Sequence, residues 1–325
     1  MKQTLVGRVI ATFGRHLLVR DADGEEVRAR PFGRALTVVC GDEVRCRLDA
    51  RHDEVHVVEV LPRRTALYRA NVRGGAEPVV ANLTRLLVVL APLPTPDLFV
   101  VDRYLAAATA ASLPATLVVN KSDLGIDAAL TAEIAVYRAA GYGTVTCSAD
   151  SGSGVAELCA VLTPGTLAAL VGQSGVGKSS LVRRILPQAQ VAIGALVRAQ
   201  DGGRHTTTAA RLFDLPDGAA LIDSPGVRDF APAAAALDER TLGFVEVERL
   251  APGCRFSDCR HLREPGCAVR AAAADGALHA RRYESYRRLR RLREELSAAR
   301  PAAQRRKRGE AHGGPGDDGS EGDDS

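Results

Sequence analysis

Eight consecutive residues of the chain have the types and spacing of a phosphate-binding loop. Residues 172–179 read Gly-Gln-Ser-Gly-Val-Gly-Lys-Ser and fit the pattern G-x-x-x-x-G-K-[ST]. An apolar stretch, Leu167–Val171, precedes them, and a helical one, Ser180–Ile185, follows. This strand–loop–helix setting disfavours the alternative of a chance glycine-rich turn.

The glycines of such a loop allow backbone N–H groups to converge on phosphate oxygens at the start of a helix. Lys178 is expected to reach the β- and γ-phosphates of a nucleotide, and the Ser179 hydroxyl is suited to bind Mg²⁺. The predicted phosphate contacts are Gly172, Gln173, Ser174, Gly175, Val176, Gly177, Lys178, Ser179 and Ser180.

An aspartate about 45 residues downstream can complete the magnesium site. The apolar stretch Ala219–Ile222 ends in Asp223-Ser224-Pro225-Gly226. Asp223 is suited to hold Mg²⁺ from its outer coordination sphere, and the Gly226 amide is suited to sense the γ-phosphate. Asp-x-Pro-Gly alone is a common turn, but its pairing with the upstream loop predicts a nucleotide switch.

Guanine recognition is predicted by Asn120-Lys121-Ser122-Asp123, which follows the apolar stretch Leu117–Val119. The Asp123 carboxylate can accept hydrogen bonds from both N1–H and the exocyclic amine of guanine. Adenine would leave this carboxylate unpaired, which disfavours an ATP-using protein. The stem of Lys121 is expected to lie along the base, with its ammonium near the phosphate loop.

A second short motif, Cys147-Ser148-Ala149, follows the strand-like Thr144–Thr146. It can supply a backbone amide to the oxygen of the base. The predicted contacts with the base are therefore Asn120, Lys121, Ser122, Asp123, Ser148 and Ala149.

The order of these motifs is unusual. In ordinary GTPases the phosphate loop precedes N-K-x-D, whereas here N-K-x-D at residue 120 precedes the loop at 172 and D-x-P-G at 223. The same sheet can form if the original termini are joined and the chain is opened elsewhere, because domain termini often lie close together. The order therefore predicts a circularly permuted GTPase domain.

A compact cluster of cysteine and histidine predicts a metal centre. Cys254, Cys259, His261 and Cys267 form C-x4-C-x-H-x5-C. Three thiolates and one imidazole match a closed tetrahedral Zn²⁺ site, which is structural because it has no open position. A set of reduced buried cysteines is the alternative, but His261 completes the count of four. The scattered cysteines are expected to act as small apolar residues, and they are Cys40, Cys46, Cys147 and Cys159.

The elements that must position these groups fall into several regions. Short alternating stretches separated by turns predict a small β-barrel in residues 1–62. Apolar strands that alternate with helical segments predict a parallel sheet with helices on both faces in residues 63–236. Residues 237–300 are expected to form a helical zinc-binding domain, and residues 301–325 a disordered tail, basic and then acidic. The predicted barrel strands are Val6–Ile10, His16–Val19, Glu26–Ala29, Glu43–Arg47 and Val55–Val60.

Charge is distributed unevenly along the chain. The net charge is +4, but residues 281–308 carry twelve Arg or Lys and three Glu, and residues 309–325 carry six acidic residues. Apolar residues recur at helical spacing in the basic stretch and predict an amphipathic helix, namely Tyr286, Leu289, Leu292 and Leu296. The basic residues form either a solvated helix face or a contact with the phosphate backbone of a nucleic acid.

Composition excludes several classes of protein. No apolar run reaches about 18 residues, so a membrane span is not expected. The start, MKQTLVGRVI, lacks the layout of a signal peptide, and seven unevenly placed cysteines argue against a secreted disulfide scaffold. We therefore expect a cytoplasmic protein, with a monomer as the simplest state.

The motif set resembles the ribosome small-subunit-dependent GTPase A family of bacteria, which are circularly permuted GTPases. The resemblance covers nearly the whole chain and includes the β domain, the three nucleotide motifs, the Cys/His cluster and Gly-Arg-His-Thr-Thr-Thr at 203–208. It implies an OB-fold at the N-terminus. It further implies binding to the small ribosomal subunit and its rRNA late in assembly, GTP hydrolysis to GDP and phosphate stimulated by the subunit, and release afterwards.

The hexapeptide at 203–208 lies where the first switch belongs. One of its threonines is expected to complete the Mg²⁺ shell, with Thr206 and Thr207 as candidates. Val227 occupies the position of the water-orienting glutamine of Ras-like proteins, so intrinsic hydrolysis should be slow. The resemblance implies that His205 orients or activates the water. A solvent-exposed switch histidine is the alternative.

The chain also departs from the family pattern. The usual A-N-x-D is Ala81-Asn82-Leu83-Thr84 here, and Thr84 lacks the carboxylate. The predicted barrel has only Phe13 and Phe32 as aromatic residues, which favours arginine–phosphate contact over base stacking. Two functions follow: a GTPase whose hydrolysis times its release, or a GTP-dependent RNA-binding assembly scaffold in which hydrolysis is incidental.

Overall fold

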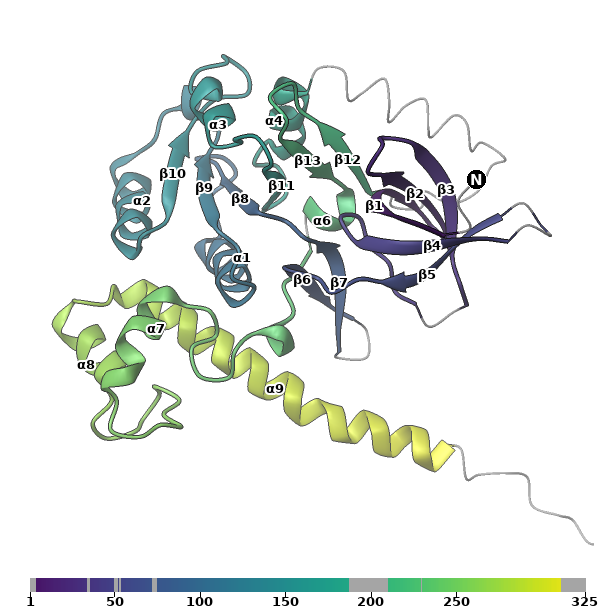
Figure 1. Cartoon of the computed structure of the whole chain (residues 1–325). Helices are drawn as coiled ribbons and strands as arrows, with labels where there is room; N and C mark the ends of the chain where they lie inside the picture. The colour runs from purple at the N-terminus through teal and green to yellow at the C-terminus, as the bar shows by residue number, and fades with distance from the viewer. Residues whose placement is uncertain are drawn as a thin grey trace, which may run out of the picture.

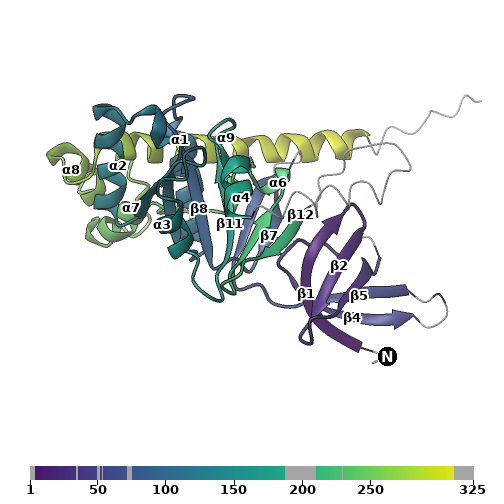
Figure 2. The same cartoon turned by 90° about the horizontal axis from the view of Figure 1, so that it is seen from above.

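The computed structural model describes residues 4–33, 36–49, 52, 54–71, 75–186, 210–228 and 230–310. A β-barrel, an α/β domain and a helical C-terminal region follow one another along the chain. The barrel lies at one end of the molecule, and helices α7 (Val245–Leu250) and α8 (Ala268–Asp275) lie at the other (Figure 1, Figure 2). The fold class expected from the sequence is confirmed.

The barrel is formed by five strands whose alternate side chains fill one core. They pair in the order β1-β2-β3-β5-β4, and pairing of β1 with β4 closes the ring. Val9, Val19, Val44 and Val57 are completely buried inside it. The strands are β1 (Thr4–Phe13), β2 (His16–Asp21), β3 (Glu26–Pro31), β4 (Glu43–Asp49) and β5 (Glu54–Val60). The five predicted barrel strands are therefore confirmed.

The α/β domain contains a mostly parallel sheet in the order β10-β9-β8-β11-β13-β12. Only β12 runs antiparallel to its neighbour in this part of the sheet. Because β12 also pairs with β1, at Ala210 and Arg211, the barrel strands and the α/β strands share one eleven-stranded sheet. The strands are β8 (Arg85–Leu90), β9 (Ala115–Val119), β10 (Gly143–Thr146), β11 (Leu167–Gly172), β12 (Ala210–Asp214) and β13 (Ala220–Asp223).

Helices cover both faces of the parallel strands, as the alternating pattern predicted. Successive side chains of β8 point to opposite faces, so Leu86 and Val88 pack in the core with α1 and α2, whereas Leu87 and Val89 pack with α3 and α4. The helices are α1 (Leu98–Ala110), α2 (Ala128–Ala140), α3 (Val155–Ala160) and α4 (Lys178–Ile185), with a short 3-10 turn η1 (Ser122–Leu124).

A two-stranded hairpin, β6 (Ala66–Ala70) and β7 (Ala76–Ala81), follows the barrel. Just after the hairpin, the buried Asn82 joins the barrel to the α/β domain. Its amide nitrogen donates to the Gly41 carbonyl of the barrel (3.0 Å), and its oxygen accepts from the Arg64 amide (2.8 Å). Thr84 links the starts of β8 and β11, because its hydroxyl accepts from the Leu167 amide (2.9 Å). The segment Ala81–Thr84 therefore contributes to the joint between domains.

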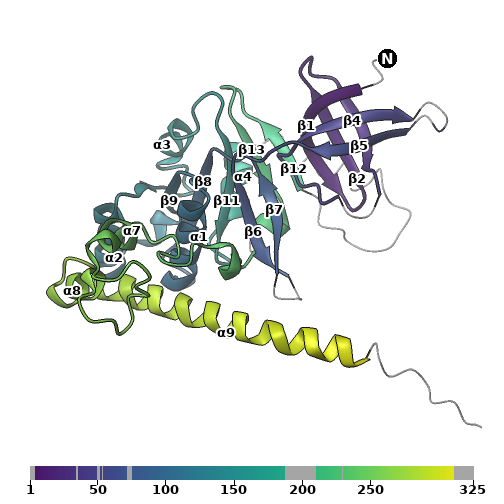
Figure 3. The same ribbon diagram turned by 60° about the horizontal axis from the view of Figure 1, so that its bottom comes forward.

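The C-terminal region ends in a helix of 31 residues, α9 (Ala280–Glu310). It starts beside α8 and runs along one side of the α/β domain (Figure 1, Figure 3). Tyr286 and Leu289 are buried, and Leu292 and Leu296 pack against the same core, which confirms the predicted amphipathic pattern. The helix continues ten residues past position 300, where the tail was expected to begin.

Short elements connect β13 to α9. They are α6 (Pro225–Arg228), η2 (Ala234–Ala236), α7 (Val245–Leu250), η3 (Ala251–Gly253) and α8 (Ala268–Asp275). Within the part of the chain that the structure describes, no helix combines the length and the apolar character needed to cross a membrane.

Candidate nucleotide site and metal centre

The nucleotide motifs meet at one edge of the sheet. The phosphate loop follows β11, Asn120 follows β9, and Asp223 ends β13; these strands are parallel, so their carboxyl ends lie on the same side. Such an edge is where ligands bind in open α/β sheets. A cavity of about 570 Å³ lies there, and its lining includes Asn120, Lys121, Asp123, Ala149, Gly177 and Ser180.

Two glycines of the phosphate loop are required by the close approach of neighbouring groups. Gly172 has φ +149°, and a Cβ there would lie 2.2 Å from the Val89 carbonyl oxygen. Gly177 has φ +90°, and a Cβ there would lie 2.3 Å from the Asn120 amide nitrogen. Any side chain would push β8 or the base-binding motif away from the loop.

The lysine of the loop is buried against the loop's own backbone. Lys178 Nζ donates to the carbonyl oxygens of Gly172 and Gln173, both at 2.7 Å. The Gln173 side chain accepts from the Asp97 amide at the start of α1 (2.9 Å). The ammonium is thus bonded to the backbone of the loop that the motif assigns to phosphate.

Hydrogen bonds join the base motif to the other two motifs. The buried Asn120 donates to the Val176 carbonyl of the phosphate loop (2.9 Å) and accepts from the Ala149 amide (3.0 Å). Ser148 donates to one oxygen of Asp123. The structure therefore brings Asn120, Asp123, Ser148, Ala149 and the phosphate loop together, as expected for one site. The Ala149 amide, a candidate for contact with the base, is here bonded to Asn120.

Lys121 adopts a left-handed backbone conformation with φ 58°, and its Nζ donates to the Leu93 carbonyl (2.9 Å). Its Cε would lie 3.7 Å from a Cβ at Gly177, so the stem passes beside the phosphate loop. Ser122 begins the turn η1 that carries Asp123.

The residues proposed for magnesium contact an arginine that sequence reasoning missed. Arg228 Nε donates to Asp223 Oδ1 (2.5 Å), its Nη2 binds Oδ2, and its Nη1 donates to Ser179 Oγ (2.5 Å). The amide of Gly226 donates to the Ser224 hydroxyl (3.1 Å). The sequence indicates this contact only through the position of Arg228, five residues after Asp223. In the structure Arg228 is the last residue of α6.

Three predicted residues cannot be placed. His205, Thr206 and Thr207 lie outside the described residues, so the structure adds nothing to the expectation that they act in the first switch.

The metal centre brings its four predicted ligands together. The ligand atoms of Cys254, Cys259, His261 and Cys267 all lie within 4.8 Å of one another. The sulfurs of Cys254 and Cys267 are 3.9 Å apart, and His261 Nδ1 lies 3.4 and 3.5 Å from them. A tetrahedral Zn²⁺ with Zn–S of about 2.3 Å and Zn–N of about 2.0 Å gives separations of about 3.8 and 3.5 Å. The donor set and its spacing fit zinc.

The surroundings favour the metal-binding form of His261 and Cys254, whereas burial raises the thiol pKa of Cys259 to about 12 and also raises that of Cys267. Burial, assisted by the positive charges of Arg240 and Arg290, lowers the pKa of His261 to about 4. The imidazole is therefore neutral near pH 7 and has a lone pair for a metal. Burial opposes ionisation of Cys254, but hydrogen bonds from the Val269 and Ala268 amides lower its pKa overall.

Helix α9 makes hydrogen bonds to the backbone of the loop that carries the metal ligands, residues 254–267. Tyr283 donates to the His261 carbonyl (2.7 Å), and Tyr286 donates to the Arg260 carbonyl (2.9 Å). Glu264 accepts hydrogen bonds from three backbone amides of the same loop, those of Arg260, Leu262 and Arg263. These contacts support the loop through backbone groups, in addition to the side chains of the four expected metal ligands.

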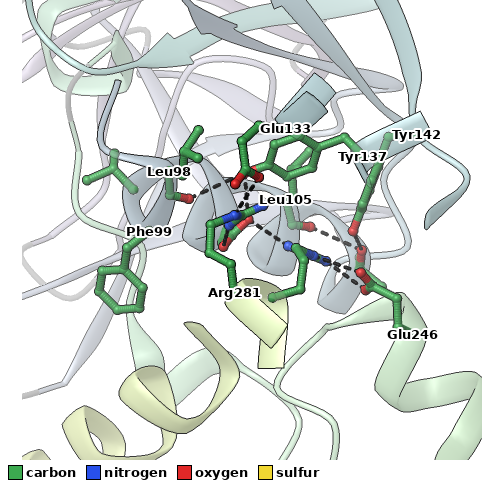
Figure 4. A network of polar contacts seen from close by, with 12 residues as sticks. Leu98, Phe99, Leu105, Glu133, Tyr137, Tyr142, Glu246 and Arg281 are labelled. Carbon is green, nitrogen blue, oxygen red and sulfur yellow. Dashed lines mark hydrogen bonds and ion pairs between the residues drawn. The ribbon is translucent and has the colours of Figure 1, made fainter. Parts of the chain in front are cut away.

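A buried ion-pair cluster joins α9 to the α/β domain (Figure 4). Asp102 of α1 is completely buried and accepts from Arg281, Arg282 and Tyr137, each at 2.7 Å. Arg282, which is 1% exposed, also binds Glu246 of α7 through two hydrogen bonds of 2.7 Å. Part of the basic stretch is therefore neither a solvated face nor free for nucleic acid, because its arginines satisfy buried acids.

Comparison with known protein families and structures places these features in context. A sequence model of the family described as RsgA GTPase matches residues 60–232. A protein of Pseudomonas aeruginosa (strain LESB58) named Small ribosomal subunit biogenesis GTPase RsgA is 43% identical over 288 residues, which cover 86% of this chain and 83% of that protein. A protein of the same name from Azotobacter vinelandii is also 43% identical, with the same coverage.

Two crystal structures share the fold. YjeQ from Thermotoga maritima aligns with a TM-score of 0.65 and 25% identity, covering 90% of this chain and 98% of that one. YloQ, described as a circularly permuted GTPase, aligns with a TM-score of 0.65 and 23% identity, covering 92% and 96%. The similarity therefore extends from the barrel to the C-terminal helices.

Proposed function

The chain belongs to the RsgA GTPase family, and from this membership we propose that it binds the small ribosomal subunit late in assembly, hydrolyses GTP there and is then released. The partner is proposed from the relatives, whose name states a role in biogenesis of the small ribosomal subunit. The reaction converts GTP and water to GDP and phosphate.

The observation that carries the proposal is the position of Asn120. It bonds at once to the phosphate loop and to the Ser148–Ala149 motif, so residues distant in the sequence form one site. Asp123 lines the cavity beside it and is proposed to accept from N1–H and the exocyclic amine of guanine. A GTP-specific pocket follows from this arrangement.

Each group at the phosphate end of the site has a proposed role. Lys178 is proposed to turn from its two carbonyl partners to the β- and γ-phosphates. Ser179 and Asp223 would hold Mg²⁺, which neutralises charge on the phosphates when bound. The Gly226 amide would contact the γ-phosphate in place of the Ser224 hydroxyl.

Slow intrinsic turnover is part of the proposal. Val227 is 2% exposed and has no polar atom with which to orient water. We assign that task to His205, and completion of the Mg²⁺ shell to Thr206 or Thr207. The zinc centre is structural, and exposed arginines of α9 such as Arg287 and Arg291 are proposed to contact rRNA phosphates.

Phosphate release with and without purified small subunits tests this function. We expect a slow rate for the protein alone and a rise of at least about a hundredfold with small subunits, as for other GTPases completed by a partner. Large subunits serve as the control. An unchanged rate with small subunits would contradict the proposal.

An experiment in cells distinguishes an assembly scaffold from a GTPase whose hydrolysis releases it from the subunit. If a His205→Ala protein supports normal subunit maturation, the assembly scaffold with incidental hydrolysis is the better description. A variant that binds immature particles and stays on them instead favours hydrolysis as the release step.

A further inference from the structure

The guanidinium of Arg228 lies at the place assigned to magnesium. It makes two hydrogen bonds to the carboxylate of Asp223 and a third, of 2.5 Å, to the Ser179 hydroxyl. Asp223 is only 7% exposed, so a bidentate pair here is shielded from water and stronger than a surface pair. A cationic group therefore already bridges the two side chains that the nucleotide motifs assign to Mg²⁺.

Arg228 already occupies the oxygen atoms that a cation between these groups would use. Both oxygens of Asp223 accept from the same guanidinium, one from Nε and the other from Nη2. The Ser179 hydroxyl is within hydrogen-bond distance of Nη1. A divalent ion bound by Ser179, with Asp223 in its outer coordination sphere, would lie close to the guanidinium carbon and its positive charge. Arg228 and Mg²⁺ therefore compete for the same two side chains.

Arg228 belongs to the segment that responds to the γ-phosphate. It ends α6, which begins two residues after Asp223. The amides of Val227 and Arg228 both donate to the Ser224 carbonyl, and the Gly226 amide donates to the Ser224 hydroxyl. The guanidinium contacts thus hold α6 closed onto β13 and the phosphate loop. Departure of Arg228 would remove the polar side-chain contacts that tie the end of α6 to Asp223 and Ser179.

From these contacts we infer that Arg228 is an internal counter-ion that competes with Mg²⁺ at Ser179 and Asp223. Binding of the magnesium–nucleotide complex exchanges one cation for the other and releases the end of α6. The inference rests on the proposed function, because it requires a guanine nucleotide with Mg²⁺ at this site. It identifies Arg228 as the residue that sets the Mg²⁺ concentration required for nucleotide binding. It also couples Mg²⁺ binding to movement of α6.

A magnesium titration tests this competition. Binding of a fluorescent GDP analogue is followed at a fixed nucleotide concentration as Mg²⁺ is raised, for the native protein and for Arg228→Ala. The variant should reach half-saturation at an about tenfold lower Mg²⁺ concentration, as expected when one charge-assisted competitor is removed. Arg228→Lys keeps the charge but cannot bond Ser179 and both Asp223 oxygens together, so its midpoint should lie between the two.

Matched controls separate this effect from general loss of an ion pair. Arg20 pairs with Asp214 of strand β12 at 2.7 Å and contacts neither Ser179 nor Asp223. Arg20→Ala is therefore the control that removes an ion pair elsewhere. Its Mg²⁺ midpoint should equal that of the native protein. Circular dichroism establishes that each variant is folded. If Arg228→Ala does not fold, the shift of the Arg228→Lys midpoint decides.

Hydrogen exchange supplies a second readout. Amides of residues 226–228 should lose protection when Mg²⁺ and the GDP analogue bind to the native protein, and should already be less protected in Arg228→Ala. A Mg²⁺ midpoint in folded Arg228→Ala within twofold of the native value would overturn the inference. If the alanine variant does not fold, an Arg228→Lys midpoint equal to the native value would overturn it. So would complete loss of magnesium-dependent binding in a folded variant. If the native protein binds no guanine nucleotide at all, the proposed function itself fails.

Discussion

The nucleotide site and the metal centre arrange their groups in two different ways. The metal centre takes four donors from the fourteen residues between Cys254 and Cys267, and their ligand atoms lie within 4.8 Å of one another. The nucleotide site takes its groups from residues 120–228, and several of them bond to other parts of the chain. Lys178 bonds to loop carbonyls, Asp223 to Arg228, and the Gly226 amide to Ser224.

The difference reflects what each site must do. A buried charge without a partner is costly, so a site that binds and releases its ligand benefits from internal partners of matching charge. A centre that keeps its ion needs no such partners. The contacts therefore predict that the nucleotide site exchanges partners upon binding, whereas the metal centre contributes directly to folding.

The largest expected effect separates the two sites by removing one metal ligand. Cys259→Ser should release zinc and abolish hydrogen-exchange protection across residues 254–267, because metal binding in such clusters supplies about 10 kcal/mol or more of folding free energy. Affinity for GDP should change less than about twofold, since Cys259 contacts no nucleotide motif. Zinc content and hydrogen exchange measure the outcome.

Cys159→Ser is the matched control, because this cysteine lies in α3, outside the cluster. It should retain zinc. Full zinc occupancy in Cys259→Ser would show that the cluster is not the metal site. A parallel collapse of GDP binding would show that the two sites are not independent.

A smaller effect is expected from changing base recognition in the nucleotide site. Asp123→Asn should weaken GTP binding by about 10²–10⁴-fold and favour xanthosine triphosphate, because an amide can donate to the oxygen that xanthine carries in place of the guanine amine. Competition binding with the two nucleotides measures the change. Asp127→Asn, at the start of α2, is a control that removes a nearby carboxylate. An unchanged preference for guanosine would contradict the contact assigned to Asp123.

The smallest effect concerns the loop that carries the metal ligands. Burial opposes ionisation of Glu264, but the backbone amides around it lower its pKa to about 2. A lowered carboxyl pKa stabilises the folded state above the ordinary pKa near 4.5, and that stabilisation is lost as the pH falls towards 2. Glu264→Gln should therefore lower the free energy of unfolding by about 1–2 kcal/mol at pH 7.

Urea unfolding at pH 7, 5 and 4 measures this difference, which should begin to shrink at pH 4. Glu284→Gln, whose carboxylate is half exposed on α9, should change stability much less at every pH. A difference between Glu264→Gln and the native protein that is independent of pH would show that the carboxylate charge is not responsible.

Local patterns predicted most of the elements and the metal ligands. The strands β1–β5, β9, β11 and β13 follow from alternation and apolar runs, and the grouping of the four expected metal ligands follows from spacing within a short segment. Contacts between distant residues were not predictable. Nothing around Arg228 indicates that it will bond to Ser179, which lies 49 positions earlier.

The basic stretch shows the same limit. Its charge predicted a helix face exposed to solvent or to nucleic acid. Arg282 and Arg290 are nevertheless almost completely buried. Arg282 is buried because Asp102 and Glu246, 180 and 36 positions away, lie where α9 packs. Only the tertiary arrangement decides which arginines of a helix satisfy internal acids and which remain outside.

The pairing of β1 with β12 also has a consequence for solubility. Without the barrel, β12 would be the outer strand of the sheet, and its unpaired backbone groups would offer a template for edge-to-edge association. The barrel covers this strand at Ala210 and Arg211 and continues into a closed ring that has no free edge of its own at β1. The N-terminal domain therefore covers part of a sheet edge that the α/β domain would otherwise offer for edge-to-edge pairing.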